Sequence, residues 1–102
     1  MDVTFRDNVS LARVEMVVDG RVAGFVEYEL SHDRIELNHT EVFDEYAGQG
    51  LARALVAHVL EGARVRGLTV RPHCSYVAAY LRDHLAEWLD LIAESDRPAF
   101  GV

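Results

Sequence analysis

The spacing of hydrophobic and polar residues changes character near residue 43. Before that point, apolar and polar positions partly alternate, with the period of two that predicts β-strands, over residues 11–18, 21–30 and 34–42. Asp19-Gly20 between the first two segments is typical of a two-residue hairpin turn, and Ala23-Gly24 indicates a bulge. Residues 31–33 predict a second turn. The first 42 residues are therefore predicted to form an antiparallel meander, with residues 3–10 as a loop or an edge strand.

From residue 51 onward the apolar positions recur at helical spacing, as shown by Leu51, Leu55, Val59 and Ala63. Arg64 and Arg66 in the last turn, followed by Gly67, predict the end of this helix. The remaining segments predict a short strand stopped by Pro72 and two further helices, over residues 68–71, 75–82 and 86–93. The predicted fold class is α+β (mixed α/β), in a single compact domain over residues 1–102.

The composition of the chain argues against several classes of partner and ligand. The chain has 102 residues, half of them hydrophobic, which is enough for one core. Its net charge of −7 argues against a nucleic-acid or anionic-membrane partner, and no apolar run is long enough to span a bilayer. No secretory signal is expected after Met1, and Cys74 is the one cysteine, so we expect a reducing cytoplasm. The histidines show no helical zinc spacing, so no metal site is predicted.

A glycine-bearing loop precedes the long predicted helix. Gly48, Gly50 and Ala52 are small enough to let an anion approach the unpaired N–H groups at the helix start. A pyrophosphate would fit there. The spacing matches neither a dinucleotide fingerprint nor a Walker motif, and no Lys is present to contact a phosphate. The loop taken alone is therefore equally consistent with a simple turn into the helix.

Several short motifs occur in an order that is more specific than any one of them. They are His39-Thr40-Glu41-Val42, Gly48-Gln49-Gly50-Leu51-Ala52, Arg66-Gly67-Leu68, Pro72-His73-Cys74-Ser75-Tyr76-Val77 and Ala79-Tyr80-Leu81. From residue 13 to residue 91 the chain resembles the GNAT N-acetyltransferase superfamily, and more closely its small, single-domain YjdJ-type branch. One departure concerns Ala47, because the superfamily's phosphate motif usually begins with Gln or Arg at this position.

The resemblance implies that acetyl-CoA (coenzyme A) is the cofactor. Its pantetheine arm would run between the strands predicted over residues 34–42 and 68–71, with a backbone N–H near Val42 or Phe43 facing the thioester. Arg53, in the first helical turn, is a candidate to compensate for Ala47. The predicted cofactor-binding residues are Val42, Phe43, Gly48, Gln49, Gly50, Leu51, Ala52, Arg53 and Tyr80.

Three side chains are candidates for the chemistry. Cys74 precedes a predicted helix, where the dipole lowers a thiol pKa, and the small branch carries a Cys here; a buried structural Cys is the alternative. Unbroken alternation over residues 34–42 places His39 and Glu41 on one face with Ile35 and Leu37. His39 and Glu41 are candidate bases, although both types of residue also occur as ordinary strand residues. Direct transfer to an amine is favoured over an acetyl-cysteine.

The leading function is therefore N-acyl transfer from acetyl-CoA to an unidentified amine. A non-catalytic acyl-CoA-binding or sensing module, or an interaction protein that keeps the fold without the ligand, are the alternatives. The chain lacks the additional elements with which larger superfamily members hold an acceptor, so the acceptor site is open, shared across a dimer or absent. Either a monomer or a homodimer is compatible with the sequence.

Overall fold

A computed structural model describes all residues of the chain, 1–102. Its centre is a five-stranded sheet with strands in sequence order: β1 (Val3–Asn8), β2 (Arg13–Val18), β3 (Arg21–Ser31), β4 (Arg34–Val42) and β5 (Thr69–Pro72). The first four strands are antiparallel, and β5 lies parallel to β4. The predicted meander is confirmed, and the segment left open as a loop or edge strand forms β1, at one edge of the sheet.

The hairpin between β2 and β3 has the predicted turn. Asp19 has φ of 49° and Gly20 has φ of 84°, the two positive values that a type I′ turn requires. The bulge predicted at Ala23 is also present, because Met16 pairs with Gly24 whereas Val17 pairs with Val22.

A second bulge, in β4, was not predicted. Tyr28 pairs with Leu37 but its neighbour Glu27 pairs with His39, so Asn38 has no partner in β3. The extra residue reverses the alternation of side chains, as bulges do. The prediction that His39 and Glu41 share a face with Ile35 and Leu37 is therefore wrong.

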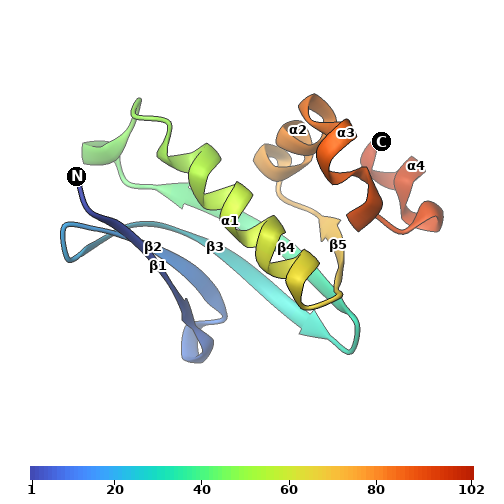
Figure 1. Ribbon diagram of the computed structural model, residues 1–102, viewed down its shortest axis with the longest axis horizontal. Helices are drawn as coiled ribbons and strands as arrows, with labels where there is room; N and C mark the ends of the chain where they lie inside the picture. The colour runs from blue at the N-terminus through green and yellow to red at the C-terminus, as the bar shows by residue number, and fades with distance from the viewer.

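Helix α1 (Leu51–Val65) lies across one face of the sheet, as Figure 1 shows. It buries its apolar stripe, including Leu55 and Leu60, in one core with strand residues such as Met16 and Leu37. Gly67 follows with φ of 69°, the left-handed conformation that ends many helices. The helix predicted from residue 51 is confirmed.

After β5 the chain forms three short helices at the β5 edge (Figure 1): α2 (Ser75–Asp83), α3 (Leu85–Trp88) and α4 (Arg97–Phe100). Residues 86–93 were predicted as one helix, but α3 ends at Trp88 and a 3₁₀ turn continues to Leu91. Arg64 of α1 holds this region, donating to the Glu87 carbonyl and the Asp90 carboxylate. None of the helices is long and apolar enough to cross a membrane.

On the sheet face opposite α1, called the open face below, side chains of neighbouring strands pack against one another. Glu15 is only 1% exposed there, and it accepts hydrogen bonds from Arg6 (2.6 Å), Arg13 (2.8 Å) and Asn8 (3.1 Å). Burial alone would raise the pKa of Glu15, but these bonds outweigh it and hold the pKa at about 2. The Arg13 guanidinium also lies 4.3 Å above the centre of the Phe25 ring.

Candidate functional site

The neighbouring strands β4 and β5 separate halfway along β4. Their pairing runs from Arg34 opposite Thr69 to Leu37 opposite Pro72. The last bond is donated by the Cys74 N–H to the Leu37 carbonyl, at 2.9 Å, and the chain then turns into α2. From Asn38 onward β4 therefore has a free edge, which forms one wall of a cleft.

Two N–H groups of β4 point toward this free edge. The Phe43 N–H donates to the Ala23 carbonyl in β3, at 2.9 Å. Because successive residues of a strand direct their N–H groups to opposite edges, Val42 and Thr40 direct theirs away from β3. Of the two predicted backbone donors, Val42 is therefore available to a ligand, whereas Phe43 is already engaged.

The glycine loop opens directly onto the start of α1. Gly48 has φ of 77° and Gly50 φ of 74°, a conformation that suits glycine. The first helical bond is donated by the Ala54 N–H to the Gly50 carbonyl, and no side chain caps the helix. The N–H groups of residues 51–53 therefore have no partner within the helix.

A pocket of about 310 Å³ lies against these unpaired groups. Six of its nine lining residues are among the predicted cofactor-binding residues: Val42, Gly48, Gly50, Leu51, Ala52 and Arg53. Tyr46, Ala47 and Tyr76 complete the lining; Gln49 is not part of it. The structure thus brings together the strand edge and the helix N-terminus, which are separated by the whole glycine loop in the sequence.

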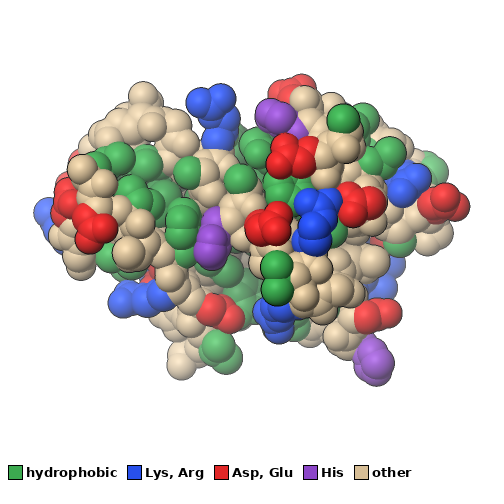
Figure 2. Space-filling view, in the orientation of Figure 1, with side chains coloured by type: hydrophobic (Ala, Val, Ile, Leu, Met, Phe, Trp, Pro, Cys, Tyr) green, Lys and Arg blue, Asp and Glu red, His purple; other side chains and the backbone are tan.

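Arg53 and Tyr76 also line a second hollow, of about 200 Å³, which extends toward α2. Tyr80 contributes to this second hollow, and its ring stacks on His84 with centroids 4.3 Å apart. Burial raises the pKa of Tyr76, so its hydroxyl keeps its proton at neutral pH. In Figure 2 the surface is hollowed at the upper edge, between the start of α1 and α2.

Cys74 lies where β4 and β5 separate, outside the lining of both hollows. It is 8% exposed, and its thiol donates to the Thr40 hydroxyl oxygen at 3.4 Å. The neighbouring His73 turns elsewhere: its Nε2 lies 2.8 Å from Glu36, and its ring packs edge-on against Phe100. Cys74 therefore has no histidine within hydrogen-bonding distance.

His39 and Glu41 lie on the opposite face of the sheet, as the Asn38 bulge dictates. His39 Nε2 is 3.4 Å from Glu41 Oε1, and the imidazole contacts the Phe25 ring edge-on. The three predicted catalytic residues thus separate into a pair on the open face and a thiol beside Thr40. Thr40 was not singled out for the site, because its position beside Cys74 depends on the bulge.

The comparisons with known proteins agree with this architecture. Residues 13–91 match the sequence model of the family described as GCN5-related N-acetyl-transferase. A search of curated proteins finds no match. Three of the similar solved structures are a GCN5-like protein from Staphylococcus aureus, the ribosomal-protein-S18-alanine N-acetyltransferase from Escherichia coli, and N-acetylglutamate synthase from Neisseria gonorrhoeae complexed with coenzyme A and N-acetyl-glutamate.

These structures are similar in fold. The S. aureus protein aligns with 21% identity and a TM-score of 0.62, covering 90% of this chain and 87% of its own. The E. coli enzyme aligns with 23% identity and a TM-score of 0.59 over 71% of this chain, which spans 50% of the enzyme. For the N. gonorrhoeae enzyme the identity is 21%, the TM-score 0.50, and the coverage 58% of this chain and 15% of the enzyme.

The fold and the matched family model define the class: a mixed α+β acetyltransferase domain with a glycine loop at a helix N-terminus. The chain belongs to the GCN5-related N-acetyltransferase family.

Proposed function

We propose that the protein transfers an acetyl group from acetyl-CoA to the amino group of an acceptor. The observation that carries this proposal is the pocket in which the unpaired N–H groups of residues 51–53 meet the free edge of β4. A helix N-terminus favours negative charge, which suits the pyrophosphate of a coenzyme A thioester. Arg53 adds a positive charge at the same place, where Ala47 contributes none.

The free edge of β4 suits the pantetheine arm, because its amides need backbone partners. Thr40 and Val42 offer outward N–H groups along the line from the phosphate pocket to Cys74. Acetyl-CoA supplies the activated acyl group. Val42 would then donate its N–H to the carbonyl oxygen that gains negative charge, which is the usual role of an oxyanion donor.

The amine acceptor would approach from the open sheet face, where His39 and Glu41 lie. A neutral amine must lose a proton as it attacks, and a carboxylate or imidazole accepts it directly or through one water. Glu41 and His39 are 45% and 53% exposed, so both are accessible to an acceptor and to solvent. We assign the proton-accepting role to Glu41, with His39 beside it.

Cys74 is given a structural role in this mechanism. A cysteine nucleophile needs a base that takes its proton. The side-chain partner of Sγ is Thr40, a hydroxyl, and Cys74 is almost fully buried. These contacts favour direct transfer from acetyl-CoA to the amine over an acetyl-cysteine.

Acetyl-CoA binding is tested by the thermal midpoint of unfolding with and without the ligand. At about a hundred times its dissociation constant, the ligand should stabilise the fold by roughly 2.7 kcal/mol, a shift of several degrees for this size. Ala52→Glu places a carboxylate at the phosphate pocket and should abolish the shift, while its charge favours the helix start. Ala52→Gln, of similar size but uncharged, is the matched control and should retain most of the shift.

Catalysis is tested separately from binding by measuring release of free coenzyme A with a panel of primary amines. Release that depends on the amine, and that Ala52→Glu removes, supports the transferase. A thermal shift without amine-dependent release would instead favour a non-catalytic acyl-CoA-binding module. The absence of any shift at millimolar acetyl-CoA would contradict both.

A further inference from the structure

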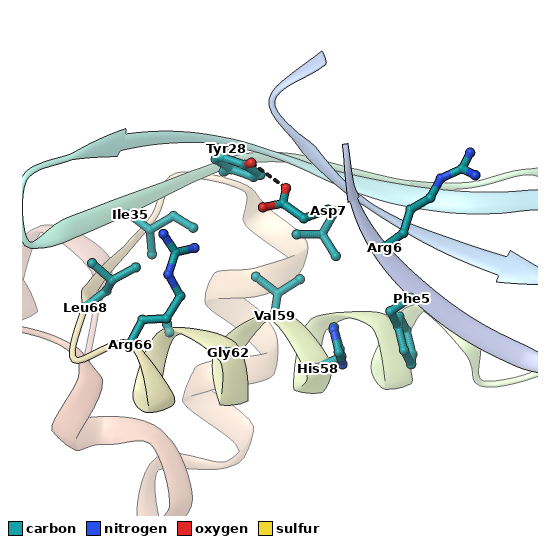
Figure 3. A pocket seen from close by; sticks show the side chains of 12 residues that line it. Phe5, Arg6, Asp7, Tyr28, Ile35, His58, Val59, Gly62, Arg66 and Leu68 are labelled. Atoms are coloured by element: carbon teal, nitrogen blue, oxygen red, sulfur yellow. Dashed lines mark hydrogen bonds between the residues drawn. The ribbon is translucent and has the colours of Figure 1, made fainter. Parts of the chain in front are cut away.

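A third cavity, of about 260 Å³, lies between the sheet and the C-terminal half of α1 (Figure 3). We refer to it below simply as the pocket. Residues from β1 to β4, from α1 and from the segment after it surround the pocket. They are Phe5, Arg6, Asp7, Val14, Tyr28, Ile35, His58, Val59, Gly62, Ala63, Arg66 and Leu68. It shares no residue with the two hollows of the acyl-CoA site.

This pocket is too far from the cleft to hold the amine acceptor. Gly62 lies twelve residues along the chain from Gly50, which at the helical rise corresponds to about 18 Å. On the strand side, Ile35 and Thr40 are five residues apart, about 16 Å in extended chain. A ligand here would therefore have a function of its own.

Gly62 lines the pocket and places no side chain in it. A Cβ at this position would meet nothing within 4 Å, so the packing of the chain itself does not require a glycine. A glycine inside a helix costs about 1 kcal/mol relative to alanine. Its position leaves the floor, formed by aliphatic side chains such as Val59 and Ile35, open to a ligand.

The mouth of the pocket holds one anion and one cation. The Tyr28 hydroxyl donates to Asp7 Oδ1 at 2.5 Å, and the other oxygen of Asp7 has no partner. The Arg66 side chain makes neither a hydrogen bond nor an ion pair, and in Figure 3 its guanidinium points into the same space as Asp7. Arg6, by contrast, points away and is paired with Glu15.

The Tyr28 hydroxyl remains a donor at any physiological pH. Burial, together with the hydrogen bond to Asp7, raises the pKa of Tyr28 to about 12. Asp7 therefore accepts one hydrogen bond from within the chain and keeps its remaining oxygen for a ligand.

We propose that this pocket binds an apolar α-amino acid as a zwitterion. The carboxylate would pair with Arg66, the ammonium with the free oxygen of Asp7, and the side chain would occupy the aliphatic floor beside Gly62. Asp7 and Arg66 are both exposed at the mouth, where water solvates each charge in the absence of a ligand. A simple carboxylate would engage Arg66 alone and a simple amine Asp7 alone, whereas an amino acid engages both and brings no net charge. The inference does not depend on the proposed acetyl transfer.

The proposal is tested by two-dimensional amide NMR with L-leucine, L-valine and L-phenylalanine as probes. At least one should give saturable shifts at residues 5–7 and 58–66, and leave residues 46–53 unchanged. For leucine, the analogues 4-methylpentanoate and 3-methylbutylamine, which lack the amine and the carboxylate, should bind at least tenfold more weakly. Failure of all three amino acids to saturate, shifts centred on residues 46–53, or analogues that bind as well as leucine would overturn the proposal.

Variants give an independent test. Arg66→Gln and Asp7→Asn should each weaken binding at least tenfold, whereas Arg21→Gln, on an exposed strand position, should leave it unchanged. Gly62→Leu should fill the pocket and abolish binding, while Gly62→Ala should retain most of it. The thermal midpoint of each variant shows that it is folded. Unchanged binding in both charge variants would contradict the proposed contacts even if Gly62→Leu fails to fold.

Discussion

Thr40 and Cys74 meet where β4 and β5 separate, with the Cys74 thiol donating to the Thr40 hydroxyl at 3.4 Å. The backbone of Cys74 is fixed at the same point by its bond to the Leu37 carbonyl. This contact joins the free edge of β4 to the start of α2. The Cys74 thiol is therefore held by a hydroxyl and not by a base.

The Cys74→Ser variant is expected to release coenzyme A at a rate within about threefold of that of the unchanged protein. Serine keeps a hydroxyl group that can bond to Thr40. Incubation with acetyl-CoA should leave no acetyl group that hydroxylamine removes, as mass spectrometry would show. A labile acetyl adduct that is absent from Cys74→Ser would establish the covalent route instead. A stable adduct would indicate the α-amino group of Met1, because the chain contains no Lys.

Glu41→Gln should lower the rate of coenzyme A release about 100-fold with little change in KM for acetyl-CoA. General base catalysis by a positioned carboxylate is worth about 10²–10⁴ in rate, and the pocket proposed for acetyl-CoA is on the other side of the sheet. Steady-state kinetics with a fixed amine provides the measurement. Glu27→Gln, on the same open face and paired in register with His39, is the matched control. Equal losses in both variants would argue against a specific role for Glu41.

Val42→Pro removes the N–H assigned to the developing oxyanion. Because this N–H points to the free edge of β4, no bond of the sheet should be lost and the fold should survive. Loss of one such donor typically costs about 10²–10³ in kcat. We therefore expect a drop of this size in coenzyme A release, with the acetyl-CoA thermal shift largely retained. Full activity in the folded variant would rule out the Val42 N–H as the oxyanion donor.

Glu15→Gln should destabilise the protein by roughly 2 kcal/mol at neutral pH, because charge-assisted hydrogen bonds from two arginines are lost. The pKa of Glu15 is about 2 in the folded state, below its ordinary value of 4.5. Its contribution is therefore complete above about pH 4.5 and is lost as the pH falls toward 2. Urea unfolding of both proteins between pH 7 and pH 2 should show the difference shrinking over this range. A difference independent of pH would contradict the assignment.

Most elements of the fold were predictable because their signals are local. Asp19-Gly20 fixes a turn through its own backbone preferences, and α1 follows from the apolar stripe and from Gly67. The family resemblance added that the strand after α1 lies beside β4, which periodicity alone does not supply.

The candidate site was less predictable because a bulge at one residue reverses the faces to which the following side chains of β4 point. Asn38 is an ordinary strand residue in the sequence, and its bulge depends on how β4 pairs with β3. The C-terminal segment depends on distant partners in the same way: Arg71 of β5 pairs with Asp96 at 3.0 Å, twenty-five residues later. Neither the bulge nor this ion pair can be recognised from the spacing of hydrophobic and polar residues nearby in the sequence.

The separation of β4 from β5 also determines how fast individual amides exchange with deuterated water. His39 and Glu41 direct their N–H groups into the sheet, whereas Thr40 and Val42 direct theirs toward the cleft. Exchange along this strand should alternate between slow and fast from one residue to the next. A molecule bound along the edge would slow only the fast members, so the loss of this alternation would report occupancy of the cleft whatever acyl group or acceptor the protein uses.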